Sequence, residues 1–302
     1  MSGAARRGWP MLAFALLLAT NLAGVAAAAP LRTPSPGTGV YHGLSVNGRF
    51  TLGEERSDDG PELAEAIAAV DVKYTPATSW SFTVTVLRVE RTAKGRDRRE
   101  TRLSGLGDVK LSGKYRFFRQ LGRWRDRQAA FGFGVELPTG ARRTLAADAA
   151  LPLSLREAVQ PGSDSTDFFA DLSYQQARGR HVQAAAVGYR RNGEGDGYRF
   201  GDEARLDLDA EAIVLPRKYE VPGHEVFALI EASLVHRGSD ELHGARVPGT
   251  SRTELLLAPG LEYVATEQLA LGISAAVPVV AHVDDDGLAS RWQLLVEARY
   301  AF

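Results

Sequence analysis

Residues 291–302 read RWQLLVEARYAF, and their alternation decides the fold class. Every second position is apolar in most of this stretch, at Trp292, Leu294, Val296, Ala298, Tyr300 and Phe302. Polar or charged side chains lie between them, at Arg291, Gln293, Glu297 and Arg299. Successive side chains of a strand point to opposite faces, whereas a helix cannot separate these two sets. The segment is therefore predicted to be a strand with one apolar and one charged face.

The same alternation recurs along the rest of the chain. It predicts eleven further strands, at residues 44–52, 66–74, 80–86, 109–117, 131–137, 168–174, 182–189, 206–212, 226–234, 255–263 and 269–279. Strands of roughly 9–11 residues cross an outer membrane at a tilt, and an even number returns both ends to one side. We therefore expect an all-β fold: a closed antiparallel transmembrane β-barrel of about 12 strands, preceded by a cleaved signal peptide.

The connections between the predicted strands alternate in length. The short ones are 75–79, 177–180 and 265–268, with two longer ones, 119–127 and 215–223, on the same side. The others are long and polar: 54–61, 91–102, 139–162, 192–202, 237–250 and 284–290. Short periplasmic turns opposite long external loops are typical of outer-membrane barrels, and a soluble sandwich has no reason to sort its loops in this way.

Aromatic residues support the same arrangement. Several lie near the short-turn ends of the strands, where an interfacial girdle is expected: Trp80, Phe117, Phe118, Trp124, Tyr174, Tyr263, Tyr300 and Phe302. An alternating strand that ends in an aromatic residue is what the barrel-assembly machinery recognises, so this machinery is an expected partner.

The first residues carry an export signal rather than part of the fold. Arg6 and Arg7 precede an apolar core at residues 11–18, and alanines at 26–29 follow. A positive start, a short apolar core and small residues at the end describe a secretory signal peptide, and the core is short for a membrane anchor. We expect cleavage after Ala28, which gives a signal peptide at 1–28 and a barrel at 29–302 in a Gram-negative outer membrane.

Composition excludes several classes of protein. The 302 residues include 36 basic and 37 acidic side chains, so the basic excess of a nucleic-acid-binding protein is absent. Without cysteine there can be no disulfide, Cys-ligated zinc, iron–sulfur cluster, thiol nucleophile or lipidated-cysteine anchor. Expected partners are instead outer-membrane lipid, lipopolysaccharide and a small-molecule solute, with no nucleic acid.

If the apolar set faces lipid, the charged set faces the lumen. The predicted lumen-lining residues for transport are Arg49, Asp71, Lys73, Asp108, Lys110, Lys114, Arg116, Glu136, Asp171, Arg205, Asp207, Asp209, Glu211, Glu231, Glu254, Glu262, Arg291, Glu297 and Arg299. A hydrated lumen with rings of charge passes small polar or charged solutes. The alternative is a non-conducting barrel whose acids and bases pair across the lumen and that has a structural or surface-binding role, although burying so many charges is costly.

Short glycine-containing motifs carry a family resemblance. GLGDV at 105–109 leads into KYRF at 114–117, GFGVELPTG follows at 132–140, and PGLEY at 259–263 precedes AVP at 276–278. From about residue 44 to 302, the sequence resembles the MetA-pathway of phenol degradation family of outer-membrane proteins. The resemblance implies a barrel for passive uptake of aromatic or other small organic compounds, with no residue-level site.

The sequence contains none of the common enzymatic or metal-binding motifs. The six histidines form no His-x-Ser pair and no His-Glu-x-x-His, and no Gly-x-Ser-x-Gly elbow occurs, so we expect no enzyme, cofactor or metal site. The acidic residues at 284–286 could hold Ca²⁺, but a solvated external loop is the favoured interpretation. Basic residues at 91–102 could contact lipopolysaccharide phosphates, with a mobile charged loop as the simpler interpretation. The glycines at 192–197 lack the strand-to-helix setting of a phosphate-binding loop.

Overall fold

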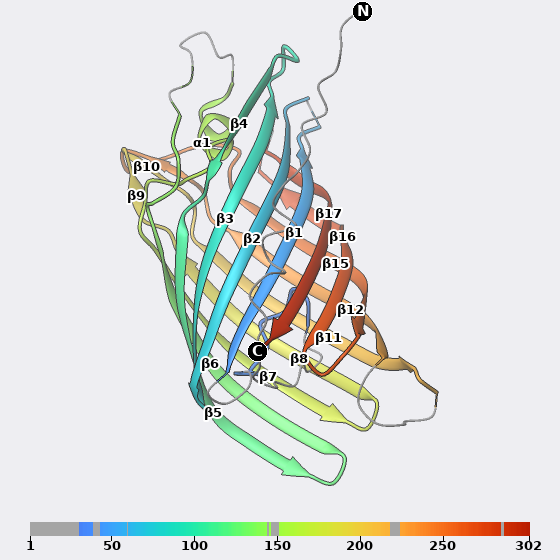
Figure 1. Cartoon of the computed structure of the whole chain (residues 1–302). Coiled ribbons are helices and arrows are strands. Elements are labelled where there is room, and N and C mark those ends of the chain that lie inside the picture. Colours follow the sequence, from blue (N-terminus) through green and yellow to red (C-terminus); the bar gives the residue numbers. More distant parts are fainter. Residues whose placement is uncertain are drawn as a thin grey trace, which may run out of the picture.

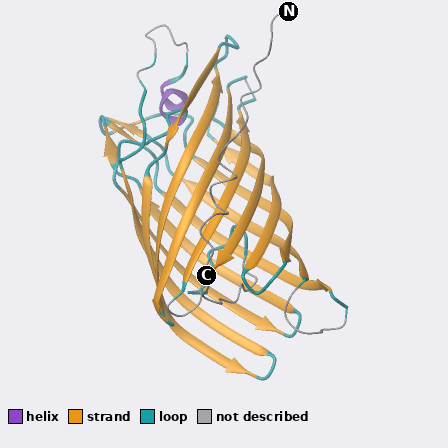
Figure 2. Cartoon of the chain, viewed as in Figure 1, coloured by secondary structure: helices purple, strands orange, loops and turns teal. Residues whose placement is uncertain are grey.

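The computed structural model describes residues 30–38, 43–58, 60–143, 145, 151–217, 224–284 and 287–302, and it shows a closed barrel (Figures 1 and 2). Its wall is one antiparallel sheet in which β1 pairs with both β2 and β17. The wall strands are β1 (Leu44–Arg56), β2 (Glu62–Ala77), β3 (Trp80–Lys94), β4 (Glu100–Leu106), β5 (Val109–Gly122), β6 (Arg125–Leu137), β7 (Asp167–Arg178), β8 (His181–Arg191), β11 (Glu203–Leu215), β12 (Glu225–Arg237), β15 (Arg252–Val264), β16 (Leu269–Val283) and β17 (Ala289–Ala301).

The sheet has 13 strands but twelve positions, because β4 and β5 share one. Both strands pair with β3: β4 pairs with residues 88–94 of β3, and β5 pairs with residues 80–85. The backbone breaks between them at Gly107, whose N–H still donates to the Leu87 carbonyl at 2.9 Å. A Cβ on Gly107 would lie 2.0 Å from Leu87 Cδ1, so only glycine fits this break.

Each predicted strand is present, and the expected fold class of a closed barrel with about twelve strands is confirmed. The prediction of a long turn at 119–127 was wrong. There, β5 continues beyond β3 and pairs with β6 as far as Gly122, which leaves only Arg123 and Trp124 between the two strands (Figure 1). The predicted signal peptide at 1–28 and most of the turn at 215–223 lie outside the described residues.

Burial along the strands is the inverse of that in a soluble protein. On β11, Leu206 and Leu208 are 40% and 50% exposed, whereas Asp207 and Asp209 are only 1% and 5% exposed. The same holds on β12, where Ile230 is exposed and Glu231 is buried. A closed sheet with an apolar exterior and a charged interior is suited to a lipid bilayer. Its outer face is apolar, and its wall has no unpaired edge.

Smaller elements lie on the long-loop end of the barrel. The connection between β6 and β7 contains the short helix α1 (Leu153–Ala158), shown in purple in Figure 2. The connections after β8 and β12 form a small four-stranded sheet of β9 (Glu194–Gly195), β10 (Tyr198–Arg199), β13 (Glu241–Leu242) and β14 (Ala245–Arg246). Among the described residues, no helix is long and apolar enough to cross a membrane.

The pairing of β16 with β17 stops below the loop end. It runs from Leu269 to Ala276 on β16 and goes no further. Pro278 follows, and it has no N–H to donate to a neighbouring strand. Near the start of β17, the Ser290 N–H donates instead to Glu254 of β15 at 2.7 Å. Side-chain bonding thus replaces the ladder at this point of the wall.

The outward face of β11 gives a first prediction. Leu208→Arg should lower the free energy of unfolding in lipid vesicles by about 2–4 kcal/mol, because a cation would face hydrocarbon near the middle of the strand. The measurement is reversible chemical denaturation of the mature protein. Glu267→Arg, in the exposed turn between β15 and β16, is the control and should change little. Equal losses in both variants would contradict the outward placement of Leu208.

Candidate functional site

The candidate site is the lumen, and its first feature is a chain segment inside it. Residues 30–38 lie within the cylinder of strands, and the backbone N–H groups of Arg32 and Thr33 both donate to Glu231 Oε1 at 2.8 Å. The Arg32 guanidinium reaches Ser274 on β16 at 2.8 Å and Gln293 on β17 at 3.1 Å. One end of this segment is therefore fixed to β12, β16 and β17.

The other end of the segment is fixed to the opposite wall. The Lys114 ammonium on β5 donates to the Ser35 carbonyl. The Thr75 hydroxyl donates to the Thr38 carbonyl at 2.7 Å, and the Thr38 hydroxyl donates to the Thr78 carbonyl, in the turn between β2 and β3, at 2.7 Å. Residues 30–38 thus cross the lumen and narrow it.

The segment also packs against the wall. Leu31 forms a buried cluster with Leu229 and Leu295. A Cβ on Gly272 would lie 2.4 Å from Leu31 Cδ2, so the absence of a side chain on β16 makes room for Leu31. Sequence reasoning missed this segment, because its prolines and small polar residues read as a linker and carry no alternation.

The inner face of the wall is divided by charge. Basic residues lie on the β2 and β5 side: Lys73, Lys110, Lys114 and Arg116. Acidic residues concentrate on β11, β12 and β15, which lie across the barrel: Asp207, Asp209, Glu211, Glu231, Glu254 and Glu262. Opposite charges on the two sides of the lumen produce an electric field across it.

Many lumenal charges are paired, and the pairs lie along the wall. Arg49 on β1 meets Asp71 on β2 at 2.9 Å, and Lys110 on β5 meets Glu136 on β6 at 3.2 Å. In further pairs Arg205 bonds Asp207 at 2.8 Å, and Arg299 bonds Glu262 at 2.9 Å. The partners are on the same strand, on neighbouring strands or on two strands with one strand between them. These salt bridges therefore stiffen the wall without crossing the lumen.

Two predicted lumen residues have a different setting. Arg291 is at the loop end and meets Asp58 of the external connection at 3.3 Å, with 47% of its side chain exposed. Asp108 is in the break between β4 and β5, where it accepts bonds from the Gly140 N–H and the Ser163 N–H at 2.7 Å. Asp108 therefore anchors a loop. The remaining predicted residues occupy inward positions of their strands.

Residues 151–166 of the connection between β6 and β7 pack at the mouth of the barrel. Leu155 of α1 and Val159 pack with Leu63 and Ala93 from the inner faces of β2 and β3. Arg91 donates to the carbonyls of Ala158 and Gln160 at 3.0 and 2.7 Å, which satisfies the last turn of α1. Arg91 was predicted in an external basic loop, but β3 extends to Lys94 and turns Arg91 inward.

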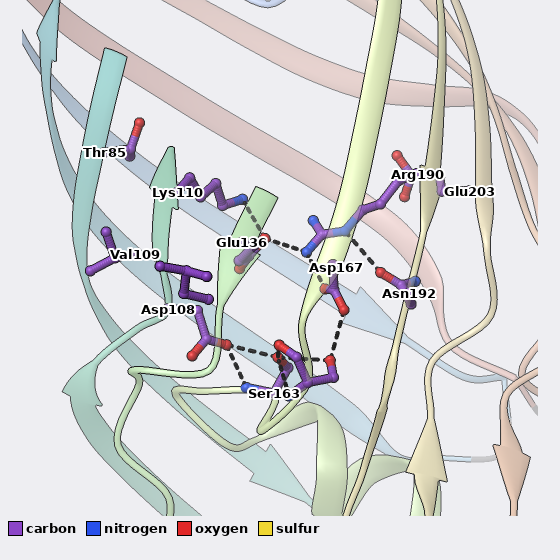
Figure 3. Close-up of polar contacts among 12 residues, drawn as sticks. Thr85, Asp108, Val109, Lys110, Glu136, Ser163, Asp167, Arg190, Asn192 and Glu203 are labelled. Carbon is purple, nitrogen blue, oxygen red and sulfur yellow. Dashed lines mark hydrogen bonds and ion pairs between the residues drawn. The ribbon is translucent and has the colours of Figure 1, made fainter. Parts of the chain in front are cut away.

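A charge network holds the base of the same connection, as Figure 3 shows. Arg190 on β8 bonds Glu136 and, at 2.7 Å, Asp167. Asp167 in turn accepts the Ser165 hydroxyl bond at 2.7 Å, close to the bonds between Ser163 and Asp108. Sequence reasoning did not select Arg190, because it lies at the end of the strand with the weakest alternation.

The neighbouring loops are joined by their own polar contacts outside the wall. The Tyr198 hydroxyl donates to Asp240, and burial together with this negative charge raises the pKa of the Tyr198 phenol. Burial acts to raise the pKa of Asp202, but bonds from Tyr189, Arg199 and the Asn192 N–H outweigh it, and the net pKa is lowered. Hydrogen bonds to the carboxyl groups of Asp240 and Asp202 thus hold the small sheet in place.

No site for a metal appears in the part of the chain that the structure describes. Within it no group of three or more His, Asp or Glu side chains is arranged to hold an ion. Asp285 and Asp286 of the acidic run at 284–286 lie outside the described residues.

Comparison with solved structures places the fold among outer-membrane barrels. An outer membrane channel from Pseudomonas putida F1 superposes with a TM-score of 0.68 at 12% identity, covering 91% of this chain and 100% of that one. The β-domain of a Bordetella autotransporter gives a TM-score of 0.50 at 13% identity, covering 86% and 100%. No family model matches the sequence, and no curated protein is similar to it. The fold is therefore that of outer-membrane channels.

Arg91 gives the second prediction. Arg91→Ala removes two bonds from a charged donor to the carbonyls after α1, and should reduce the free energy of local opening at 138–166 by about 2 kcal/mol. Protease cleavage there should become about 30-fold faster, since each 1.4 kcal/mol is a factor of ten. Limited proteolysis of the folded protein measures this rate. Arg88→Ala, on the outward face of the same strand, should leave it unchanged; equal acceleration would disprove the anchoring role.

Proposed function

We propose that the chain is a channel of the Gram-negative outer membrane for passive uptake of small solutes. The observation that carries this proposal is the charged inner face of a closed barrel whose outer face is apolar, as on β11. The likeness to a solved outer membrane channel supports the same role. In this proposal residues 1–28 direct export, the barrel-assembly machinery inserts the mature chain, and the loop end faces lipopolysaccharide.

The solutes proposed are small organic compounds with polar or charged groups. The opposed basic and acidic walls favour solutes that carry charge or a dipole, because such solutes gain from a transverse field. Uptake of aromatic compounds is proposed on the resemblance to the MetA-pathway of phenol degradation family. An aromatic acid or amine satisfies both arguments, since it combines an apolar ring with an ionised group.

Two features of the lumen favour the alternative, a non-conducting barrel with a structural or surface-binding role. Residues 30–38 cross the lumen, and residues 151–166 pack at its mouth. Under the channel proposal the same two segments set the bore and are the parts that must move for a larger solute to pass.

Conductance separates these functions and gives the third prediction. In planar bilayers the mature protein should show discrete channels. Replacement of residues 31–38 by Gly and Ser at the same length should raise the conductance several-fold. The replacement removes the packing of Leu31, the bonds from the Arg32 guanidinium to Ser274 and Gln293, and the bond from the Thr38 hydroxyl to the Thr78 carbonyl, all of which hold the segment in the lumen. A Gly-Ser replacement of the external turn at 95–99, which also keeps the chain length unchanged, is the control. Absence of current from both the mature protein and the 31–38 variant would refute the channel proposal.

The basic side of the lumen gives the fourth prediction. The double variant Lys73→Glu, Lys114→Glu reverses two charges on this side and should shift the reversal potential in a salt gradient toward cation selectivity. The matched control is Arg123→Glu, Arg125→Glu at the tip of the β5–β6 hairpin, outside the wall. A shift of the same size in the control would show that selectivity is not set at Lys73 and Lys114.

A further inference from the structure

Three carboxylates form a compact group on the acidic side of the lumen. Asp209 and Glu211 are two residues apart on β11 and face inward, and Glu231 on β12 is directly opposite Asp209 in the ladder. Directly opposite strand residues have Cβ atoms about 4.5–5.5 Å apart. Their exposures are 5%, 3% and 1%, so all three are removed from bulk solvent.

These carboxylates lack the partners that their neighbours have. Both oxygens of Asp209, both of Glu211 and Oε2 of Glu231 have no hydrogen-bond partner among the described residues. Asp207, two residues earlier on β11, receives bonds from Arg205 and the Ser233 hydroxyl at 2.8 and 2.5 Å. The carboxyl groups of Asp209 and Glu211 are within hydrogen-bond range of each other, and Arg299 attracts Glu211 electrostatically as Arg32 attracts Glu231. Contact between two buried carboxylates of like charge is strongly unfavourable, so this pair requires a shared proton or a further positive partner.

The segment at 30–38 covers the group and neutralises it only in part, through the electrostatic attraction between Arg32 and Glu231. Leu31 packs on Leu229, which is directly opposite Glu211, and the N–H groups of Arg32 and Thr33 occupy only Oε1 of Glu231. The guanidinium of Arg32 bonds Ser274 and Gln293 instead. The site therefore combines unpaired carboxylate oxygens with an adjoining apolar surface.

We propose that Asp209, Glu211 and Glu231 form a binding site for an ammonium group. An ammonium carries three N–H donors and one positive charge, which suits a group of neighbouring carboxylates. The adjoining surface of Leu31, Leu229 and Leu295 suits the alkyl part of a primary amine. A metal ion is the weaker candidate, since the described residues include no group of three acidic or histidine ligands arranged for one.

The ammonium group has two alternative sources, the α-amine of the mature chain and the amine of a solute. Cleavage after Ala28 would free an α-amine two residues before Leu31, which is a chain reach of about 7 Å. A primary amine that enters the lumen presents the same group. Binding at this site does not depend on conduction. Absence of current would therefore refute the channel proposal and leave this one standing, and absence of amine binding would refute this proposal and leave the channel proposal standing.

Acylation of the mature protein tests the chain's own amine. Purified, folded protein is treated with an N-hydroxysuccinimide acetate at pH 7, and the rate at the N-terminal peptide is followed by mass spectrometry. If the α-amine occupies the site, the double variant Asp209→Asn, Glu211→Gln should be acylated at least tenfold faster than the unmodified sequence. The charge-matched control Glu194→Gln, Glu267→Gln, at two exposed loop positions, should react at the original rate.

Calorimetric titration with n-butylammonium chloride, against sodium chloride at equal ionic strength, tests a solute amine. If the site takes a solute, butylammonium should bind the original sequence at least tenfold more tightly than the Asp209→Asn, Glu211→Gln variant, with acylation rates equal in both. Heat modifiability on gels verifies that each variant is folded. Equal acylation rates together with equal butylammonium binding would overturn the proposal, and would leave a proton shared between the two carboxyl groups as the neutralising partner.

Discussion

Backbone hydrogen bonding in a medium without water is the constraint on which the rest of the structure depends. Each N–H and C=O in the hydrocarbon region needs a partner within the protein, and a closed sheet provides one for both edges of every strand. The pairing of β1 with β17 removes the last free edge. Once the sheet is closed, the period of two sends alternate side chains to lipid and to the lumen. The exposed leucines and buried aspartates of β11 follow from this single requirement.

The interior solves a second problem, which is how to keep many charges inside a narrow cylinder. Ion pairs along the wall, such as those of Arg49 and Lys110, neutralise charge locally and leave the centre of the lumen to other groups. The segment at 30–38 uses that space and bridges the acidic and basic sides through Glu231 and Lys114. Residues 151–166 pack at the mouth through α1 and Arg91. A transverse field and a narrow bore are thus properties of the same arrangement.

Strand positions were predictable because alternation is a local signal. The segment at 291–302 shows both faces within twelve residues, and its partner strands repeat the pattern. The prediction of a long turn at 119–127 was wrong, because its charged residues lack alternation and yet continue the pairing of β5 with β6 on both sides of Arg123 and Trp124. The prediction that Arg91 lies in an external loop was wrong for a related reason. The sequence near a strand end does not show whether a charged side chain faces solvent or a folded loop.

The sequence by itself determined a barrel of about twelve strands, with a charged interior and loops sorted by length, because these depend on residues adjacent in the chain. Only the tertiary structure decided which charges meet, since Arg299 reaches Glu262 across an intervening strand and Arg190 joins residues from three strands. It also decided that residues 30–38 lie inside the lumen, and that the carboxyl groups of Asp209 and Glu211 contact each other there. Such relations arise from closing the sheet, which brings together residues that no local pattern connects.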